Sequence, residues 1–314
     1  MNFLIIDEPD YAARYRRYLE PSFPQVRFTE VHSEEAARGP IRETDILLSY
    51  ANFISDDLIR LASRLRWIQA QTTGVDGIVD LPSLDKQVIV TSTRGIHAPP
   101  VSELAVLMML ALNRDLPGNV RNQERRIWDR WPGKVLHRKT VGILGVGTIS
   151  ATLARQCKAF GMQVIGFTAT PRNTENFDRM VPRGDLVRIA PELDYLVILA
   201  PLSPATRNIV DEKVFAAMKP TSYLINVGRG GIVKEDALLE ALRAEQIAGA
   251  GLDAFANEPL AADHPFWSME NVIITPHVGG RYDQIVDYKL PIFERNLRCF
   301  LDGDYEHMMN IVPR

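Results

Sequence analysis

The sequence predicts an α/β protein with two doubly wound, Rossmann-like domains, each a parallel sheet covered by helices. Short β-branched and apolar runs alternate with longer helical stretches from one end of the chain to the other, which is typical of parallel sheets with helices on both faces. Two such series follow one another. A chain of 314 residues, 46% of them hydrophobic, is also long enough for two domains with a core each.

The first series fills the amino-terminal part of the chain. Its expected strands cover residues 3–6, 26–31, 46–50, 67–70 and 88–91, with helical segments such as 56–64 between them. A last helical segment, 282–301, is expected to return to this domain and make it discontinuous. We therefore expect one domain of residues 1–97 with 283–314, and a second of residues 98–282.

The second series predicts a complete doubly wound sheet. Its expected strands cover residues 141–144, 164–167, 195–199, 223–227, 249–252 and 272–275. Before it lies a helix that Pro99 and Pro100 could open, running through SELAVLMMLALNR and apolar nearly all round. Such a helix indicates burial at a domain junction or a subunit interface. Residues 115–139 show little periodicity and are interpreted as an arm around a partner subunit or a surface excursion.

Composition excludes several classes of protein. The formal net charge is only −3 and basic residues are spread along the chain, so neither nucleic acid nor an anionic membrane is an expected partner. The longest apolar stretch, 104–112, is short of the about 20 residues that span a bilayer. Cys157 and Cys299 form neither a disulfide framework nor a metal-binding pattern, which together with the absence of a signal-peptide pattern favours the cytoplasm.

The segment TVGILGVGTIS indicates a dinucleotide site. Gly145 and Gly147 follow an apolar strand and precede a helical run that begins near Thr148 and Ile149. A pyrophosphate needs exposed backbone N–H groups at a helix start, and glycines let the chain approach it closely. Ser150 replaces the third glycine of the usual pattern, at a position that serves packing. The alternative is a tight turn without a ligand.

The end of the following strand favours NADP over NAD. An acidic residue normally stands there to bind the ribose 2′-hydroxyl, but this chain has Thr168. Thr168 and Thr170 could donate hydrogen bonds to a 2′-phosphate and Arg172 could neutralise it. The alternative is that Arg172 is a solvated loop residue.

Three later segments each place one reactive residue just beyond a strand: LINVGRGG with Arg229, GLDAFANEPL with Glu258 and NVIITPHVGG with His277. Ligands gather at the carboxyl ends of such strands. Together with the glycine loop, QTTGVDGI, TRGIHAPPVSELAV and APLSPATRNIV, these segments resemble the D-isomer-specific 2-hydroxyacid dehydrogenase family over nearly the whole chain. That family includes glyoxylate and hydroxypyruvate reductases, phosphoglycerate dehydrogenase and formate dehydrogenase.

The resemblance implies an NAD(P)-dependent enzyme that transfers a hydride to or from C2 of a 2-keto or 2-hydroxy acid. It implies that Arg229 clamps the substrate, that His277 is the acid in reduction and the base in oxidation, and that Glu258 is its partner. These roles suit the chemistry, because a guanidinium grips carboxylates through a planar fork and imidazole exchanges protons near neutral pH. As lone residues, all three could instead be ordinary loop residues.

Supporting residues follow from the same resemblance. It implies that residues 1–97 with 283–314 form the substrate domain, where the N–H groups of Gly74 and Val75 anchor the substrate carboxylate. Asp253 matches the residue that binds the nicotinamide carboxamide, although it could be a buried structural acid. The cofactor groove in residues 98–282 would further include Pro201, Leu202, Thr206, Val227, Gly228, Gly279 and Gly280.

Within the family, a short reductase of glyoxylate, hydroxypyruvate or a larger 2-keto acid is favoured. The resemblance also implies a homodimer, paired through the helix after Pro100 and the arm that follows it. The alternative from another class is a nucleotide-sensing corepressor built on the same fold, a role that some relatives have adopted. The presence of all three reactive residues favours the enzyme.

Overall fold

The computed structural model describes residues 1–314 and divides the chain into two compact units. The first unit comprises Met1–Ile96 and Tyr282–Arg314, and the second comprises His97–Arg281. Both junctions lie one residue away from the boundaries expected at 97/98 and 282/283. Each unit contains one parallel sheet with helices, so the predicted α/β class is confirmed.

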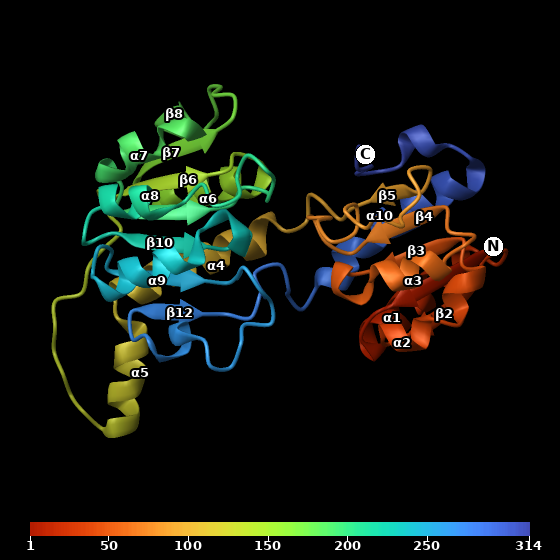
Figure 1. Ribbon diagram of the computed structural model, residues 1–314, viewed down its shortest axis with the longest axis horizontal. Helices are drawn as coiled ribbons and strands as arrows, with labels where there is room; N and C mark the ends of the chain where they lie inside the picture. Colours follow the sequence, from red (N-terminus) through yellow and green to blue (C-terminus); the bar gives the residue numbers. More distant parts are fainter. The chain divides into compact units, whose positions relative to one another are not determined.

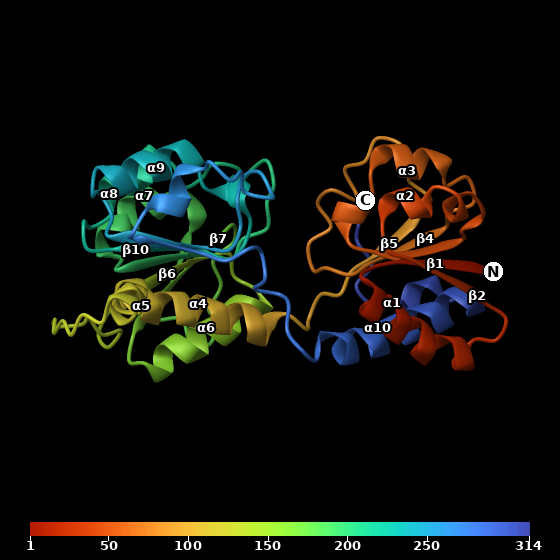
Figure 2. The same cartoon turned by 90° about the horizontal axis from the view of Figure 1, so that it is seen from below.

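The sheet of the first unit has five parallel strands in the order β2-β1-β3-β4-β5 (Figure 1). The strands are β1 (Asn2–Ile6), β2 (Arg27–Val31), β3 (Ile46–Ser49), β4 (Trp67–Ala70) and β5 (Ile89–Thr91). Helices α1 (Pro9–Leu19) and α10 (Ile285–Asp302) cover one face, and α2 (Glu34–Ala37) and α3 (Asp56–Leu61) cover the other (Figure 2). Alternate strand residues therefore fill two cores, with Phe3 on the first side and Leu4 on the second.

The sheet of the second unit has seven parallel strands in the order β12-β11-β10-β9-β6-β7-β8. The strands are β6 (Thr140–Leu144), β7 (Gln163–Thr168), β8 (Arg179–Pro182), β9 (Tyr195–Ile198), β10 (Tyr223–Asn226), β11 (Gly249–Leu252) and β12 (Val272–Ile274). Helices α4 (Ala98–Asn113) and α6 (Thr148–Ala159) cover one face, and α7 (Leu186–Ile189), α8 (Glu212–Ala217) and α9 (Glu235–Arg243) cover the other (Figure 2).

Short 3₁₀-helices occupy several connections. They are η1 (Glu20–Ser22), η2 (Pro40–Glu43), η3 (Ala51–Phe53), η4 (Arg183–Asp185), η5 (Ala190–Glu192), η6 (Gly230–Ile232), η7 (Pro265–Ser268) and η8 (Tyr305–His307). No helix of either unit has both the length and the apolar character needed to cross a bilayer.

Two elements differ from the sequence prediction. Strand β8 was not expected, because RMVP carries a charge at one end and a proline at the other; as the edge strand beside β7 it tolerates both. The segment 115–139 contains helix α5 (Leu116–Arg125), whose first turn holds a proline and whose start is capped by the Asp115 carboxylate. Residues 126–139 form neither helix nor strand.

Both sheets have a switch point where ligands usually bind. In the first sheet the strand order changes direction between β1 and β3, and in the second between β6 and β9. At such a point the loops at the carboxyl ends of two neighbouring strands run to opposite faces and leave a crevice.

Candidate active site

The loop after β6 suits a dinucleotide. Gly145 has a φ of +101°, and a Cβ added to it would lie 2.4 Å from the backbone nitrogen of Ala200, in the loop after β9. Only glycine fits where these two loops meet at the switch point. No atom lies within 4 Å of a Cβ added to Gly147, so the side of the loop next to the first-turn N–H groups of Thr148 and Ile149 in α6 is open there.

Ser150 is buried and caps the start of α6. Its hydroxyl accepts a hydrogen bond from the Gly147 N–H at 2.6 Å and donates one to the Gly147 carbonyl at 2.8 Å. The departure from the usual third glycine is thus accommodated without blocking the loop. The two hydrogen bonds of the Ser150 hydroxyl also cap the start of α6 and stabilise this end of the helix, where the phosphates of a dinucleotide are expected.

The residues after β7 present hydroxyls and a guanidinium. Thr168 ends the strand and is half-buried, whereas Thr170 and Arg172 are exposed in the loop that follows. No carboxylate stands between Thr168 and Arg172. A 2′-phosphate would therefore meet donors and a positive charge here, without a nearby acid on this loop to repel it.

The loop after β9 is held by Thr206. Its buried hydroxyl donates to the Pro201 carbonyl at 2.7 Å and accepts from the Ser203 N–H at 2.8 Å. The threonine hydroxyl therefore shapes the loop from within. Leu202, in the same loop, lies against Gly231: a Cβ added to Gly231 would be 3.3 Å from the methyl groups of Leu202.

Arg229 follows β10 in a tightly packed loop, directly after Val227 and Gly228. Its Nη1 donates to the Gly228 carbonyl at 3.0 Å, and the Asn226 side-chain amide donates to the Arg229 carbonyl at 3.2 Å. A Cβ on Gly230 would lie 1.8 Å from the carbonyl carbon of Phe255. Gly230 therefore lets the Arg229 loop pack directly against the loop that carries Glu258.

His277 and Glu258 form a hydrogen-bonded pair, with 2.7 Å between His277 Nδ1 and Glu258 Oε2. The other oxygen, Oε1, accepts from the Phe255 N–H at 2.9 Å. The hydrogen bond to Glu258 raises the pKa of His277, outweighing the opposite effect of burial. Burial acts to raise the pKa of Glu258, but the bonds from His277 and Phe255 outweigh it and the pKa is lowered. The pair therefore favours imidazolium beside carboxylate.

Asp253 holds the loop that carries His277. Its buried carboxylate accepts from the Thr275 hydroxyl at 2.6 Å, the Val278 N–H at 2.9 Å and the Gly279 N–H at 2.9 Å. His277 lies between these anchors with a left-handed φ of +51°. The alternative interpretation of Asp253 as a buried structural acid thus has direct support, whatever else the carboxylate binds.

The other glycines of this loop and the predicted anchor in the first unit are also placed. A Cβ on Gly279 would lie 2.8 Å from the Asp253 carboxylate, and one on Gly280 would lie 3.0 Å from the ring of His97. Gly74 and Val75 lie in the loop after β4, both half-buried. The structure thus brings Arg229, Glu258 and His277 together within the second unit, while Gly74 and Val75 belong to the first.

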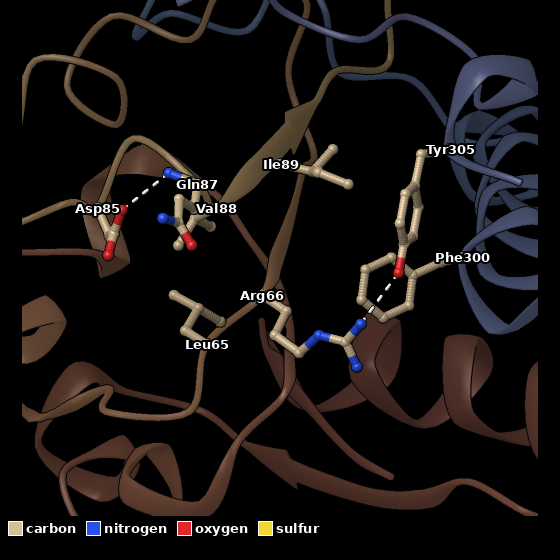
Figure 3. Close-up of a pocket in the computed structure, with 8 residues that line it drawn as sticks. All are labelled: Leu65, Arg66, Asp85, Gln87, Val88, Ile89, Phe300 and Tyr305. Carbon is tan, nitrogen blue, oxygen red and sulfur yellow. Dashed lines mark hydrogen bonds between the residues drawn. The ribbon is translucent and has the colours of Figure 1, made fainter. Parts of the chain in front are cut away.

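A cavity of about 230 Å³ is lined by residues other than these. It opens beside the starts of β4 and β5, at the amino edge of the first sheet, between Leu65, Val88, Phe300 and Tyr305 (Figure 3). Arg66 crosses it to the Tyr305 hydroxyl at 3.0 Å. Because ligands of such sheets bind at the carboxyl edge, we do not assign this cavity to the active site.

Sequence reasoning missed two residues that hold the site. The Asn226 side chain ties both ends of the Arg229 loop, since it also accepts from the Gly228 N–H at 3.2 Å. Glu235, in the first turn of α9, accepts from the Ala256 N–H at 3.0 Å and lies 3.4 Å from His264. A buried amide at the end of an apolar strand was the available signal for Asn226. Nothing local in the sequence pointed to Glu235.

Comparison with known proteins identifies the family. Residues 106–279 match the model of the NAD binding domain of D-isomer specific 2-hydroxyacid dehydrogenases. D-3-phosphoglycerate dehydrogenase of Methanocaldococcus jannaschii is 31% identical over 284 residues, which cover 89% of this chain and 54% of that protein. This chain covers 43% of the length of a second D-3-phosphoglycerate dehydrogenase, from Synechocystis, so it spans about half the length of these relatives.

Solved structures agree over the whole chain. A D-isomer specific 2-hydroxyacid dehydrogenase family protein from Aeromonas salmonicida superposes with a TM-score of 0.89 at 32% identity, covering 99% of both chains. An NADPH-dependent glyoxylate/hydroxypyruvate reductase from Sinorhizobium meliloti, in complex with NADP and sulfate, gives a TM-score of 0.85 at 26% identity, covering 99% of this chain and 98% of that one. The chain belongs to the D-isomer specific 2-hydroxyacid dehydrogenase family.

Proposed function

We propose that the chain is an NAD(P)-dependent reductase of a small 2-keto acid, with His277 as the acid, Glu258 as its partner and Arg229 as the substrate clamp. The observation that carries the proposal is the 2.7 Å contact between His277 Nδ1 and Glu258 Oε2. The loop of Arg229 meets the loop of Glu258, because Gly230 packs against the backbone of Phe255 and the Phe255 N–H binds Glu258. A cation, a proton donor and its carboxylate are what reduction of a 2-keto acid requires.

The pair fixes which atom of His277 reacts. Because Nδ1 donates to Glu258, Nε2 is the nitrogen that presents a proton to the carbonyl oxygen of the substrate. When bound, a reduced nicotinamide supplies the hydride to C2. In the oxidation direction the neutral Nε2 takes up the hydroxyl proton, and Glu258 stabilises the imidazolium that forms.

Arg229 binds the substrate carboxylate through two parallel N–H donors of its guanidinium. The bond from Nη1 to the Gly228 carbonyl, 3.0 Å, limits the directions that the guanidinium can take. The N–H groups of Gly74 and Val75 are proposed to bind the same carboxylate. Fixing the substrate in this way converts part of the entropic barrier into binding, which speeds reaction at C2.

The cofactor is proposed to lie along the carboxyl edge of the second sheet. Gly145 and Gly147 fit close approach of the pyrophosphate, and Asp253, which anchors the His277 loop, is proposed to bind the nicotinamide carboxamide. We infer that NADP is preferred over NAD, because Thr168, Thr170 and Arg172 replace the usual acid. The further proposed contacts are Thr148, Ile149, Pro201, Leu202, Thr206, Val227, Gly228, Gly279 and Gly280.

A homodimer is proposed from the apolar surface of the second unit. Trp128 is 91% exposed, and Leu107, Ile127 and Val135 are each more than half exposed. Large apolar side chains exposed on α4 and on the segment after α5 favour a protein interface there. A second copy of the chain is the proposed partner. Size-exclusion chromatography with light scattering tests this, because a monomer of 35.3 kDa at micromolar concentration would contradict it.

The activity is tested by mixing the purified chain with NADPH or NADH and glyoxylate, hydroxypyruvate or phenylpyruvate, and following the absorbance of the reduced nicotinamide. His277→Ala should lower kcat by at least about a hundredfold and leave cofactor binding nearly unchanged. Arg229→Lys should raise KM and lower kcat, because an ammonium cannot form the planar fork.

A matched control is His307→Ala. His307 pairs with Asp304 at 2.6 Å on an exposed part of the first unit, so it repeats the chemistry of the proposed pair away from the site. Its kinetics should equal those of the unmodified chain. If no 2-keto acid is reduced, the enzyme assignment is wrong and a nucleotide-sensing role is favoured instead. Near-normal turnover in His277→Ala would contradict the role of that residue.

A further inference from the structure

The cavity at the amino edge of the first sheet has the features of a binding site for a small molecule. Its lining comes from segments far apart in the sequence, namely the end of the loop before β4, the stretch that leads into β5, the last turn of α10 and η8. Leu65, Val88 and Phe300 are buried and give it an apolar side. Pockets for drug-sized ligands have about 300–1,000 Å³ and a mostly apolar lining with few polar groups. At about 230 Å³, this cavity fits a smaller ligand.

Arg66 is the cation of this lining. Its Nη2 donates to the Tyr305 hydroxyl at 3.0 Å, and its guanidinium carbon lies 5.1 Å from the centre of the Phe300 ring (Figure 3). Both partners are aromatic side chains and not acids, so these contacts hold the guanidinium in place without pairing its charge. A guanidinium carries several N–H donors in a planar fork, and the Tyr305 hydroxyl uses only one of them. The remaining donors of Arg66 can therefore bind an anion.

The other charged groups at the cavity favour an anion at the Arg66 end. Arg314 donates to the backbone carbonyls of Asp85 at 3.0 Å and Val88 at 2.8 Å, which adds a second guanidinium beside the lining. The acid of the lining, Asp85, accepts from the Gln87 N–H at 2.8 Å and lies across the cavity from the Arg66 guanidinium (Figure 3). A ligand with a single negative charge would therefore turn that charge toward Arg66 and away from Asp85.

The lining suits a carboxylate joined to a compact apolar body. The planar fork of a guanidinium matches both oxygens of a carboxylate, and such charge-assisted pairs are stronger than neutral hydrogen bonds. A phosphate brings more charge and more oxygens than one fork can bind, and Asp85 would repel the excess charge. Leu65 and Val88 lie on the other side of the cavity from the guanidinium and offer apolar contact to the rest of the ligand (Figure 3).

We propose that this cavity is a binding site for a small monocarboxylate, with the carboxylate on Arg66 and an apolar body against Leu65 and Val88. The site lies within the first unit and contains none of the proposed catalytic or cofactor-binding residues. It does not depend on the proposed reductase activity. A ligand bound here would join α10 and η8 to the starts of β4 and β5, so it should stabilise the folded first unit.

Benzoate is the probe, because it joins a carboxylate to a compact ring, and benzamide has nearly the same shape without the charge. Saturation-transfer NMR on the unmodified chain should show saturable binding of benzoate with a Kd of about 1 mM or below, and none of benzamide. Arg66→Gln should raise the Kd of benzoate at least about tenfold, because the charge-assisted fork is lost. Arg66→Lys keeps the charge but loses the fork, so its Kd should lie between these values. Benzoate should also raise the Tm of the unmodified chain.

The matched control is Arg42→Gln, which removes the same charge from an exposed arginine of η2 outside the cavity. Its Kd for benzoate should equal that of the unmodified chain. Because benzoate could also bind to Arg229, Arg229→Lys is titrated in parallel and should retain the binding that depends on Arg66.

Circular dichroism shows whether Arg66→Gln folds, and if it does not, Arg66→Lys decides alone. The inference is overturned if benzoate does not bind saturably to the unmodified chain, if benzamide binds equally well, or if substitution of Arg66 leaves the Kd unchanged. A chain that binds benzoate through Arg66 but reduces no 2-keto acid would contradict the proposed function and support this site.

Discussion

Glu258→Gln should separate the charge of the His277 partner from its shape. Glutamine keeps the length of the side chain and an oxygen that can accept from Nδ1, but it removes the negative charge. The pKa of His277 is raised chiefly by the hydrogen bond to Glu258. In the variant it should fall toward the ordinary histidine value, and the imidazolium needed for reduction should become scarcer at neutral and alkaline pH.

The size of the effect follows from the exposure of the pair. A hydrogen bond to a charged group contributes about 1.5–3 kcal/mol when enclosed. An exposed ion pair contributes about 0–1 kcal/mol. The side chains of His277 and Glu258 are 42% and 36% exposed, which places the pair between these limits. We therefore expect a loss of about 1.4 kcal/mol, or about tenfold in kcat/KM for reduction above neutral pH.

The direction of the pH dependence differs between the two reactions. Reduction needs protonated His277, so its alkaline limb should move to lower pH in Glu258→Gln, and the deficit should shrink on acidification. Oxidation needs the neutral ring, so its acid limb should move to lower pH as well, while its plateau rate should fall because Glu258 no longer stabilises the imidazolium that forms. A variant that loses the same factor at every pH, in both directions, would refute the proposed electrostatic role.

The stability that the His277–Glu258 pair contributes to the folded chain should depend on pH within a defined range. The raised pKa of His277 contributes stability that is complete below its ordinary value of 6.5 and is lost as pH rises through the raised value. The lowered pKa of Glu258 contributes stability that is complete above its ordinary value of 4.5 and is lost as pH falls through the lowered value. The difference in Tm between the unmodified chain and Glu258→Gln should therefore be largest between pH 4.5 and 6.5.

Three further substitutions have defined outcomes. Gly230→Ala places a methyl group 1.8 Å from the Phe255 carbonyl carbon. It should therefore destabilise the chain by about 1–3 kcal/mol, measured by urea unfolding, and lower kcat/KM, measured by turnover. Unchanged values would show that the Arg229 and Glu258 loops are not packed as described. Arg172→Ala should raise the KM for NADPH about tenfold and leave that for NADH nearly unchanged, and equal effects on both would remove the 2′-phosphate role. Ser150→Ala should lower stability by about 1 kcal/mol through loss of the cap on Gly147, and an unchanged urea midpoint would contradict that role.

The sequence was informative wherever one residue type has one structural use. Gly145 was predicted to need close backbone approach, and the 2.4 Å space at this point admits no side chain. The parallel sheets followed from short apolar runs such as YLVI in β9 and YLI in β10, which are buried throughout. Such runs are long enough to dominate local propensity, so the fold class could be predicted without any contact information.

The residues that hold the site were harder to predict, because their partners are distant in the chain. Asp253 holds Val278 and Gly279 across 25 and 26 positions, and nothing near GLDAF reveals that loop. The same holds in the first unit, where the buried Lys289 of α10 contacts Tyr50 across 239 positions. One signal for Lys289 was present, because it falls on the face of α10 that Ile285 and Phe293 bury four residues to either side. A charged residue at a buried helical position indicates a polar partner, but not which one.

The site loops of the second unit are coupled to one another through a series of direct contacts. Gly230 lies against the Phe255 backbone, the Phe255 N–H binds Glu258, and Glu258 binds His277. Asp253 then fixes the residues on both sides of His277, which keeps the histidine in a left-handed conformation that would otherwise be unfavourable. Because each contact joins two loops, displacing one moves the next. Substitutions at Gly230 and Glu258 should therefore be strongly non-additive in a double-mutant cycle, whereas independent loops would give additive losses.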